Sequence, residues 1–155
     1  MTETHQSPKW VAVVDALALQ ALRTHVRIEF DLRAVLRSDG PPGEVLDRAQ
    51  RILEQGVEAT KQDLFVARAL LLLHRHEVDA ECRMRVAEQV GSMHMLLFAR
   101  FSGWTCVKYF RQQSGDQAAL EASRIVGGLV PQCIDFEDET TALFDDLVDA
   151  GIPRA

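Results

Sequence analysis

Apolar side chains recur every three or four residues along most of the chain, a spacing that predicts amphipathic helices. Clusters of Ser, Asp, Gly and Pro interrupt this spacing and predict turns between the helices. No segment alternates apolar and polar residues in the way that a half-buried strand does. The pattern therefore predicts four helices, at about residues 7–37, 44–78, 79–113 and 116–151.

Three of the predicted helices begin at residues that commonly cap a helix. Ser7 is followed by Pro8, which fits an N-cap and a proline at the first helical position. Asp79 and Asp116 are expected to cap the third and fourth helices. Pro131 predicts a kink in the fourth helix, because proline lacks a backbone donor and clashes with the preceding turn.

Helices of about 30 residues joined by short connections favour an antiparallel up-down four-helix bundle. We therefore expect an all-α protein with a single helical-bundle domain over residues 1–155, in which residues 1–6 form a flexible tail. The fourth stretch carries an apolar seam at nearly heptad spacing. Its members are Ala118, Ala122, Ile125, Leu129, Phe136, Thr140, Leu143 and Leu147.

The last third of the second helix is apolar almost all round. Residues 64–73 contain only one charged side chain, Arg68. A helix that is apolar on every side is either deeply buried or part of an interface between chains. Four helices would leave one side of this segment in water, so we expect a homo-oligomer, a dimer or larger, with Phe65, Leu72 and Leu73 at the interface.

Several ionisable residues fall on faces that are otherwise apolar. His25 and Glu29 lie one turn apart on the apolar face of the first helix, so their side chains can meet. In antiparallel neighbours, turn positions place Asp63 of the second helix level with His94 of the third. We therefore predict a pair between Asp63 and His94, since a buried ionisable group needs a partner or a ligand.

The same turn positions place residue 25 in a layer with four glycines inside helices. These are Gly56, Gly103, Gly127 and Gly128. Glycine inside a helix costs about 0.5–1 kcal/mol relative to alanine, so this layer needs a reason. Either the backbones approach closely there, or the missing side chains leave a pocket beside His25 and Glu29.

A pocket beside His25 and Glu29 would suit a ligand or a metal ion. Two side chains four residues apart on one helix can bind the same metal, and His94 and Asp63 are further candidate ligands. A metal ion or haem is one interpretation, and a hydrogen-bonded buried histidine is the other. No cofactor is predicted, because the fourth helix has no histidine and no Glu-x-x-His sequence occurs.

Catalytic motifs do not appear in the sequence. There is no glycine-rich phosphate loop, no Gly-x-Ser-x-Gly sequence and no zinc-binding spacing. The expected Asp63 and His94 pair resembles a base oriented by an acid, but nucleophilic catalysis also needs a positioned nucleophile and an oxyanion site. The sequence therefore favours a protein that is not an enzyme.

Charge is unevenly distributed along the chain. The net charge is −6, which disfavours general nucleic-acid binding. Arg23 and Arg27 could nevertheless contact phosphates locally. Seven acidic residues lie between 135 and 149, so the basic first helix and the acidic last helix are complementary. This complementarity indicates contacts between subunits or with a protein partner.

Cysteine use and hydropathy bear on location. The three cysteines form no Cys-x-x-Cys pair, no signal peptide opens the chain and no apolar run spans a bilayer. We therefore expect a cytoplasmic protein without membrane contact. The leading hypothesis is a non-enzymatic helical bundle that self-associates or binds a protein partner. The alternatives are a bundle that binds a metal, haem or small ligand, and a small subunit of a nucleoprotein complex.

Overall fold

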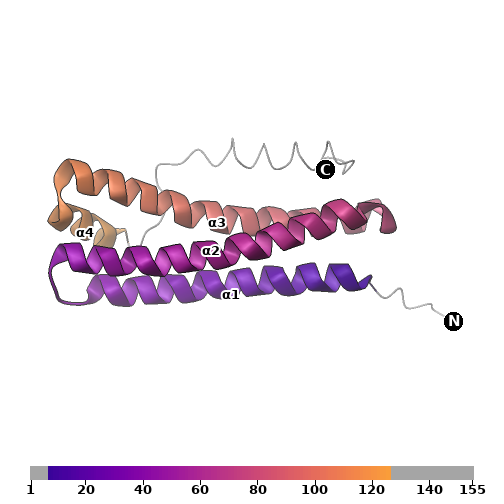
Figure 1. Cartoon of the computed structure of the whole chain (residues 1–155), viewed down its shortest axis with the longest axis horizontal. Helices are drawn as coiled ribbons and strands as arrows, with labels where there is room; N and C mark the ends of the chain where they lie inside the picture. Colours follow the sequence, from indigo (N-terminus) through magenta and orange to yellow (C-terminus); the bar gives the residue numbers. More distant parts are fainter. Residues whose placement is uncertain (1–6, 127–155) are drawn as a thin grey trace.

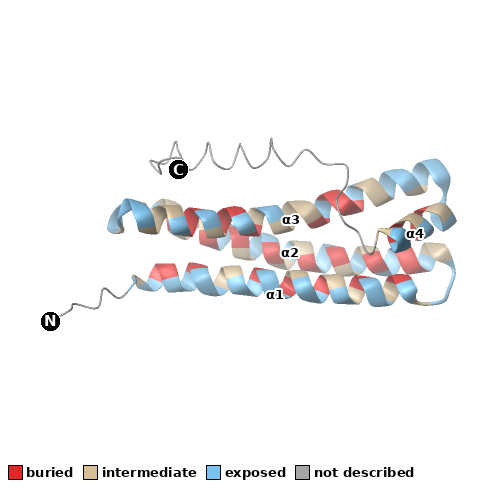
Figure 2. Ribbon diagram, turned by 180° about the vertical axis from the view of Figure 1, so that it is seen from behind, coloured by how far each residue is buried: buried red, intermediate tan, exposed pale blue. Residues whose placement is uncertain are grey.

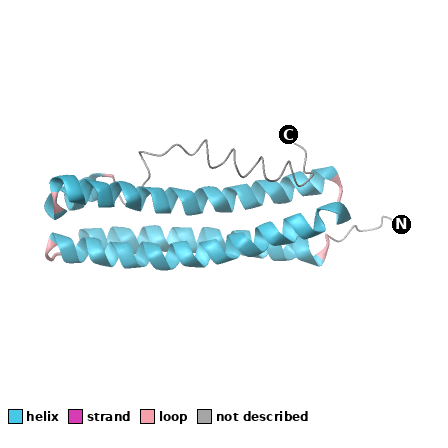
Figure 3. Ribbon diagram, turned by 45° about the horizontal axis from the view of Figure 1, so that its top comes forward, coloured by secondary structure: helices cyan, strands magenta, loops and turns pink. Residues whose placement is uncertain are grey.

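The protein is all-α over residues 7–126, the part of the chain that the computed structural model describes. Only helices and loops occur in that range (Figure 1, Figure 3). The helices are α1 (Lys9–Arg37), α2 (Pro42–His74), the short 3-10 helix η1 (Arg75–Glu77), α3 (Ala80–Ser114) and α4 (Asp116–Ile125). The predicted bounds of the first three helices are therefore confirmed to within a few residues.

The helix starts agree with the expected caps in one case and differ in two. The Asp79 side chain accepts a hydrogen bond from the Cys82 amide at 2.8 Å, which caps α3 as predicted. Helix α1 begins one residue later than expected, with Pro8 in the cap position. The prediction that Asp116 caps α4 is wrong: Gly115, at a φ of 86°, precedes the helix, and the Asp116 carboxylate accepts a hydrogen bond from Arg111.

Helices α1, α2 and α3 lie side by side and run in alternating directions (Figure 1). Helix α4 turns back from α3 and packs at the end of the molecule where α1 ends and α2 begins. Arg124 of α4 donates a hydrogen bond to the carbonyl of Leu36 at 2.6 Å, and Arg111 of α3 reaches Asp47 of α2 at 3.3 Å. The first bond holds α4 against the end of α1, and the second joins α3 to the start of α2.

Within residues 7–126, buried apolar side chains form three clusters along the helices, on the sides that face one another (Figure 2). The largest cluster joins the beginning of α1 to the end of α2 and the beginning of α3, and it includes Trp10, Val14, Leu71 and Met93. The middle cluster contains Ile28, Leu32, Ala49, Leu53 and Trp104. The last contains Leu36, Val45, Leu46, Ala119 and Leu120.

Some predictions fall outside the described residues. They are the seam from Leu129 onward, the kink at Pro131, the layer positions Gly127 and Gly128, and the tail over residues 1–6. Within the described seam, Ala118 and Ala122 are half-buried and Ile125 is exposed, whereas Ala119, Leu120 and Ser123 are buried. The buried face of α4 is therefore rotated from the predicted one. None of the described helices is long and apolar enough to cross a membrane.

Candidate functional site

A polar layer separates the two apolar clusters that share α1, α2 and α3. It contains Thr24 and His25 of α1, Thr60 of α2 and Arg100 of α3. Arg100 is the least expected member, because its side chain is long and charged and yet the residue is only 6% exposed. A buried guanidinium needs acceptors, so its partners decide what this layer can do.

Arg100 binds both of the residues that the sequence singled out on α1. Its Nε lies 3.2 Å from His25 Nδ1, and its Nη2 lies 3.1 Å from His25 Nε2 and 3.3 Å from Glu29 Oε2. The second Glu29 oxygen accepts from Arg33 at 2.8 Å, while His25 and Glu29 themselves stand 3.9 Å apart. His25 and Glu29 therefore do lie together, and a third residue joins them.

The protonation of His25 follows from this arrangement. A guanidinium can only donate, so the imidazole has to offer a nitrogen without a proton, as the neutral ring does. Burial lowers the pKa of His25, the Arg100 charge lowers it further, and Glu29 opposes them in part. His25 is therefore neutral near pH 7 and serves as an acceptor for Arg100.

Arg100 is a residue that the sequence analysis missed as part of this site. Its position follows Met93 and Leu97 and precedes Trp104, so it stands at helical spacing on an apolar face of α3. This position could have identified Arg100 from the sequence, because His25 was also identified as a polar residue at helical spacing on an apolar face. An arginine at such a position is ambiguous, because a long side chain can also extend to water from an apolar face.

The surroundings of His25 and Glu29 favour hydrogen bonding over metal binding. No group of three or more His, Cys, Asp or Glu side chains in residues 7–126 could hold a metal ion. A cation bound by His25 and Glu29 would lie close to the Arg100 guanidinium, and like charges repel strongly in a poorly solvated layer. The arrangement therefore supports the interpretation of a hydrogen-bonded histidine.

The glycine layer is closely packed at Gly56. A methyl group added to Gly56 would overlap the side chain of Ile28 on α1. A cavity of about 10 Å³ remains beside it, bounded by His25, Thr60 and Arg100 among others. Such a cavity has room for about one water molecule. Gly103 is also buried but does not line this cavity, and the cavity that His25 lines among residues 7–126 is too small for a ligand larger than water.

Within residues 7–126, the Asp63 Oδ2 and His94 Nε2 atoms do not hydrogen-bond to each other. His94 stacks on Phe98, with ring centroids 6.3 Å apart. The Asp63 Oδ2 atom is buried and accepts no hydrogen bond from the described residues. Burial raises the pKa of Asp63.

A groove also lies between α1 and α3. It has a volume of about 470 Å³, and its apolar lining comes mainly from Leu19 and Leu22 of α1 and Met93 and Leu96 of α3. Asp15, Arg85 and Glu88 stand among its charged lining residues. The volume lies within the usual range of about 300–1,000 Å³ for binding pockets.

An apolar stripe continues from this groove along the outer side of α1. Leu19, Leu22, Val26 and Phe30 follow one another at intervals of three or four residues, and each is between 48% and 74% exposed. At about 100° per residue they share one face of the helix. The 11 residue steps from Leu19 to Phe30 give the stripe a length of about 16 Å. We refer to these four residues as the α1 stripe.

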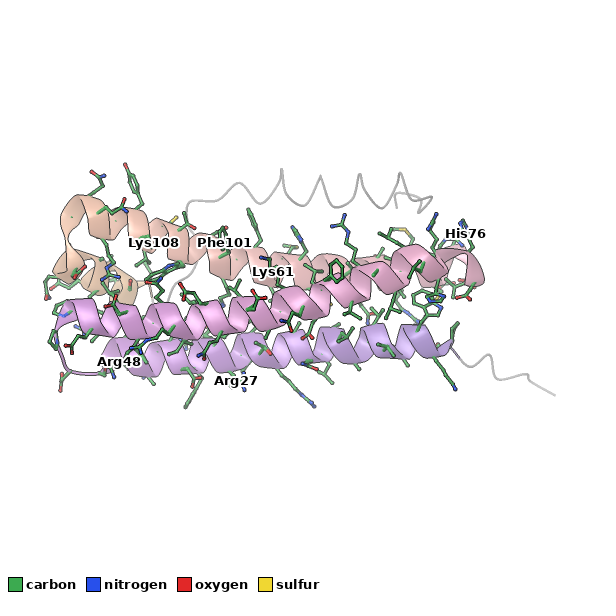
Figure 4. All side chains as sticks on the ribbon, viewed as in Figure 1. Arg27, Arg48, Lys61, His76, Phe101 and Lys108 are labelled. Atoms are coloured by element: carbon green, nitrogen blue, oxygen red, sulfur yellow. The ribbon has the colours of Figure 1, made fainter. Side chains whose placement is uncertain are left out.

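Two arginines border the α1 stripe. Arg23 and Arg27, the predicted phosphate contacts, are both exposed. Arg27 points away from α2 and α3 (Figure 4). By helical spacing both lie on the flank of the stripe opposite His25 and Glu29.

The three residues predicted to form an interface on α2 differ in their exposure to solvent. Phe65 and Leu73 are 76% and 75% exposed, as an interface would require. Leu72 is half-buried and packs against the largest apolar cluster. Leu72 therefore belongs to the fold, and Phe65 and Leu73 are the residues of this set that a partner could reach.

The chain was compared with protein-family models, curated proteins and solved structures. None matches it. Its function is therefore inferred from its own side chains.

Proposed function

We propose that this protein is a non-enzymatic helical protein that binds other protein chains, a second copy or a different protein, through exposed apolar helix faces. The observation that carries the proposal is the α1 stripe, in which four large apolar side chains stand exposed beside a groove. Contiguous apolar surface of this kind marks interaction sites more often than isolated exposed residues do.

The polar layer supports this proposal by accounting for His25 and Glu29 within the fold. Arg100 uses both residues as acceptors, and the adjacent cavity holds about one water molecule. The two residues then stabilise the contact between α1 and α3. A ligand or metal site at His25 has less support than an interaction surface on α1.

The same proposal includes the architecture and the location. Helices α1, α2 and α3 alternate in direction, which supports an up-down four-helix bundle for the complete chain. It also includes a cytoplasmic location, because three cysteines without a Cys-x-x-Cys pair are most simply free thiols in a reducing compartment.

Photo-crosslinking in the cells that make the protein tests the proposal. A photoreactive amino acid replaces Val26 in the α1 stripe, and the matched control replaces Val13, an exposed apolar residue of α1 that does not line the groove. We expect one protein adduct of defined mass from position 26 and none from position 13. Equal yields from the two positions, or no protein adduct from position 26, would contradict the proposal.

A further inference from the structure

We infer that the contact between His25 and Arg100 is an acid-sensitive switch. Protonation of His25 releases its ring from Arg100 and opens the polar layer between α1 and α3, while the apolar clusters on either side stay packed. The inference goes beyond the proposed function and does not depend on it. It rests on the positions of Arg100, His25 and Glu29 in the middle of the helices.

The charged groups around His25 favour its neutral ring. Arg100 of α3 places its Nε 3.2 Å from Nδ1 of the ring and its Nη2 3.1 Å from Nε2. Glu29 of α1 lies 3.9 Å from Nε2, but its two oxygens also accept from Arg100 and Arg33. The α2 side chains that line the cavity beside the ring carry no charge. A protonated ring therefore stands beside Arg100 with only a carboxylate that is already shared, and the two cations repel.

His25 is the member of this pair that can leave the layer. Its side chain is 23% exposed, whereas the side chain of Arg100 is 7% exposed. A rotation about the Cα–Cβ bond carries the imidazole towards water, which solvates the charged ring. Arg100 meanwhile keeps Glu29 as an acceptor at 3.3 Å. Protonation should therefore turn His25 outward and leave the Arg100 Nε without its acceptor.

Water then takes the place of the ring. The cavity bounded by His25, Gly56, Thr60 and Arg100 has a volume of about 10 Å³, which is room for about one water molecule. A buried donor without an acceptor is unfavourable, so water enters the space that the ring leaves and accepts from Arg100. The layer becomes hydrated, and the contact between α1 and α3 opens at this level.

The opening is local because the layer lies between two apolar clusters. Ala21 and Met93 belong to the cluster on one side, and Ile28 and Trp104 belong to the cluster on the other. The buried members of both clusters are apolar, so acid does not change their charge. They hold α1, α2 and α3 together while the layer opens.

The direction of the switch follows from the pKa of His25. Burial lowers this pKa from the ordinary value of 6.5, the Arg100 charge lowers it further, and Glu29 raises it in part. Because the ring binds a proton more weakly in the closed layer than in water, proton uptake favours the open layer. The layer is therefore closed at pH 7.5 and opens as the pH falls below 6.5.

Thiol labelling of the full-length protein tests the inference. Thr60→Cys places a thiol in the layer, where Thr60 is 5% exposed, and Val86→Cys places one in the largest apolar cluster, where Val86 is fully buried. Dithiodipyridine still reacts with thiols in acid, and peptide mass spectrometry identifies the labelled residue. Relative to the denatured chain at the same pH, we expect labelling at position 60 to become at least tenfold faster between pH 7.5 and pH 5.0. Labelling at position 86 should not change.

Two histidine variants identify the group that takes up the proton. His25→Gln in the Thr60→Cys chain should abolish the response, because glutamine keeps an acceptor and does not titrate in this range. His76→Gln removes an exposed histidine of η1 and should leave the response unchanged. In the wild-type chain, nuclear magnetic resonance should show the Arg100 Nε–H signal shifting with the same midpoint as the His25 ring. Circular dichroism should show the same helix content at both pH values.

The inference fails if labelling at position 60 ignores acid, or if it responds equally in the His25→Gln chain. It also fails if position 86 becomes reactive together with position 60, because acid then unfolds the protein as a whole. If Thr60→Cys does not fold, the wild-type spectra decide, and an Arg100 signal that does not follow His25 overturns the inference. Crosslinking at Val26 tests the proposed function separately from all of these results.

Discussion

In the cluster of Arg100, His25 and Glu29, the buried Arg100 side chain favours the neutral form of His25. Arg100 lies within hydrogen-bond distance of both ring nitrogens of His25 and donates to the one that carries no proton. The α2 side chains that line the adjoining cavity, Val57 and Thr60, carry no charge. His25 therefore faces Arg100 from α3 and Glu29 from its own helix. Protonation of the ring would place two positive charges side by side and would remove the acceptor that Arg100 uses.

His25→Gln should make the stability of the protein less sensitive to acid. Because the pKa of His25 is lowered in the folded state, the unfolded chain binds the proton first, and stability falls as the pH drops from about 6.5. Glutamine keeps an acceptor oxygen and does not titrate. Urea unfolding at pH 7.5 and pH 5.0 measures the effect. If the variant loses as much stability as the wild type between these pH values, His25 is not the group whose protonation destabilises the protein in acid.

Asp63→Asn should have the opposite dependence on pH. Burial raises the pKa of Asp63 in the folded protein, so the ionised side chain opposes folding. The protonated side chain contributes fully to stability at low pH, and this contribution is lost as the pH rises above about 4, the ordinary pKa of an aspartate. The variant should be more stable than the wild type at pH 7, by up to about 1 kcal/mol. Thermal unfolding at pH 7 and pH 3.5 tests this, since the gain should shrink at the lower pH. A lower melting temperature for the variant at pH 7 would show that the carboxylate is needed.

At the scale of helices, Gly56 sets how closely α2 approaches α1. An alanine there would collide with Ile28, whose side chain fills the space that a β-carbon needs. Gly56→Ala should therefore destabilise the protein by about 1–3 kcal/mol through overpacking, although alanine favours an isolated helix by about 1 kcal/mol. Chemical denaturation of the single variant measures the balance.

The double variant of Gly56→Ala with Ile28→Val provides the control. The shorter side chain removes the Cδ1 atom that collides first, so the cost of the alanine should fall in this background. If the alanine costs the same with either residue at position 28, the contact between Gly56 and Ile28 does not limit the approach of the two helices.

At the scale of the whole molecule, the exposed apolar residues of α2 bear on self-association. Phe65 and Leu73 are in water in the single chain, whereas Leu72 contributes to the core. Leu73→Glu should lower the oligomeric mass measured by analytical ultracentrifugation and leave the helix content unchanged. Leu72→Glu should instead reduce stability, because a charge would enter an apolar cluster. A wild-type protein that sediments as a monomer at every concentration would contradict self-association through α2.

Much of the fold could be predicted from the sequence because its signals are local. The apolar spacing and the turn residues predicted the bounds of α1, α2 and α3 to within a few residues. The antiparallel order of these helices also predicted that residue 25 lies level with Gly56 and with the part of α3 around residue 100. The start of α4 was less predictable, because the Asp116 side chain is taken by Arg111 and cannot cap the helix.

The sequence by itself determined the helices, since helix formation depends on residues three and four positions apart, and it drew attention to His25 and Glu29 as polar residues on an apolar face. Only the tertiary structure decided what those residues contact. Arg100 is 75 positions from His25 along the chain, and only helix packing brings them together. Helix packing also decided that Leu72 lies against the core while Phe65, Leu73 and the α1 stripe are exposed. The sequence could not separate these residues, because apolar residues at helical spacing predict a buried face wherever they occur.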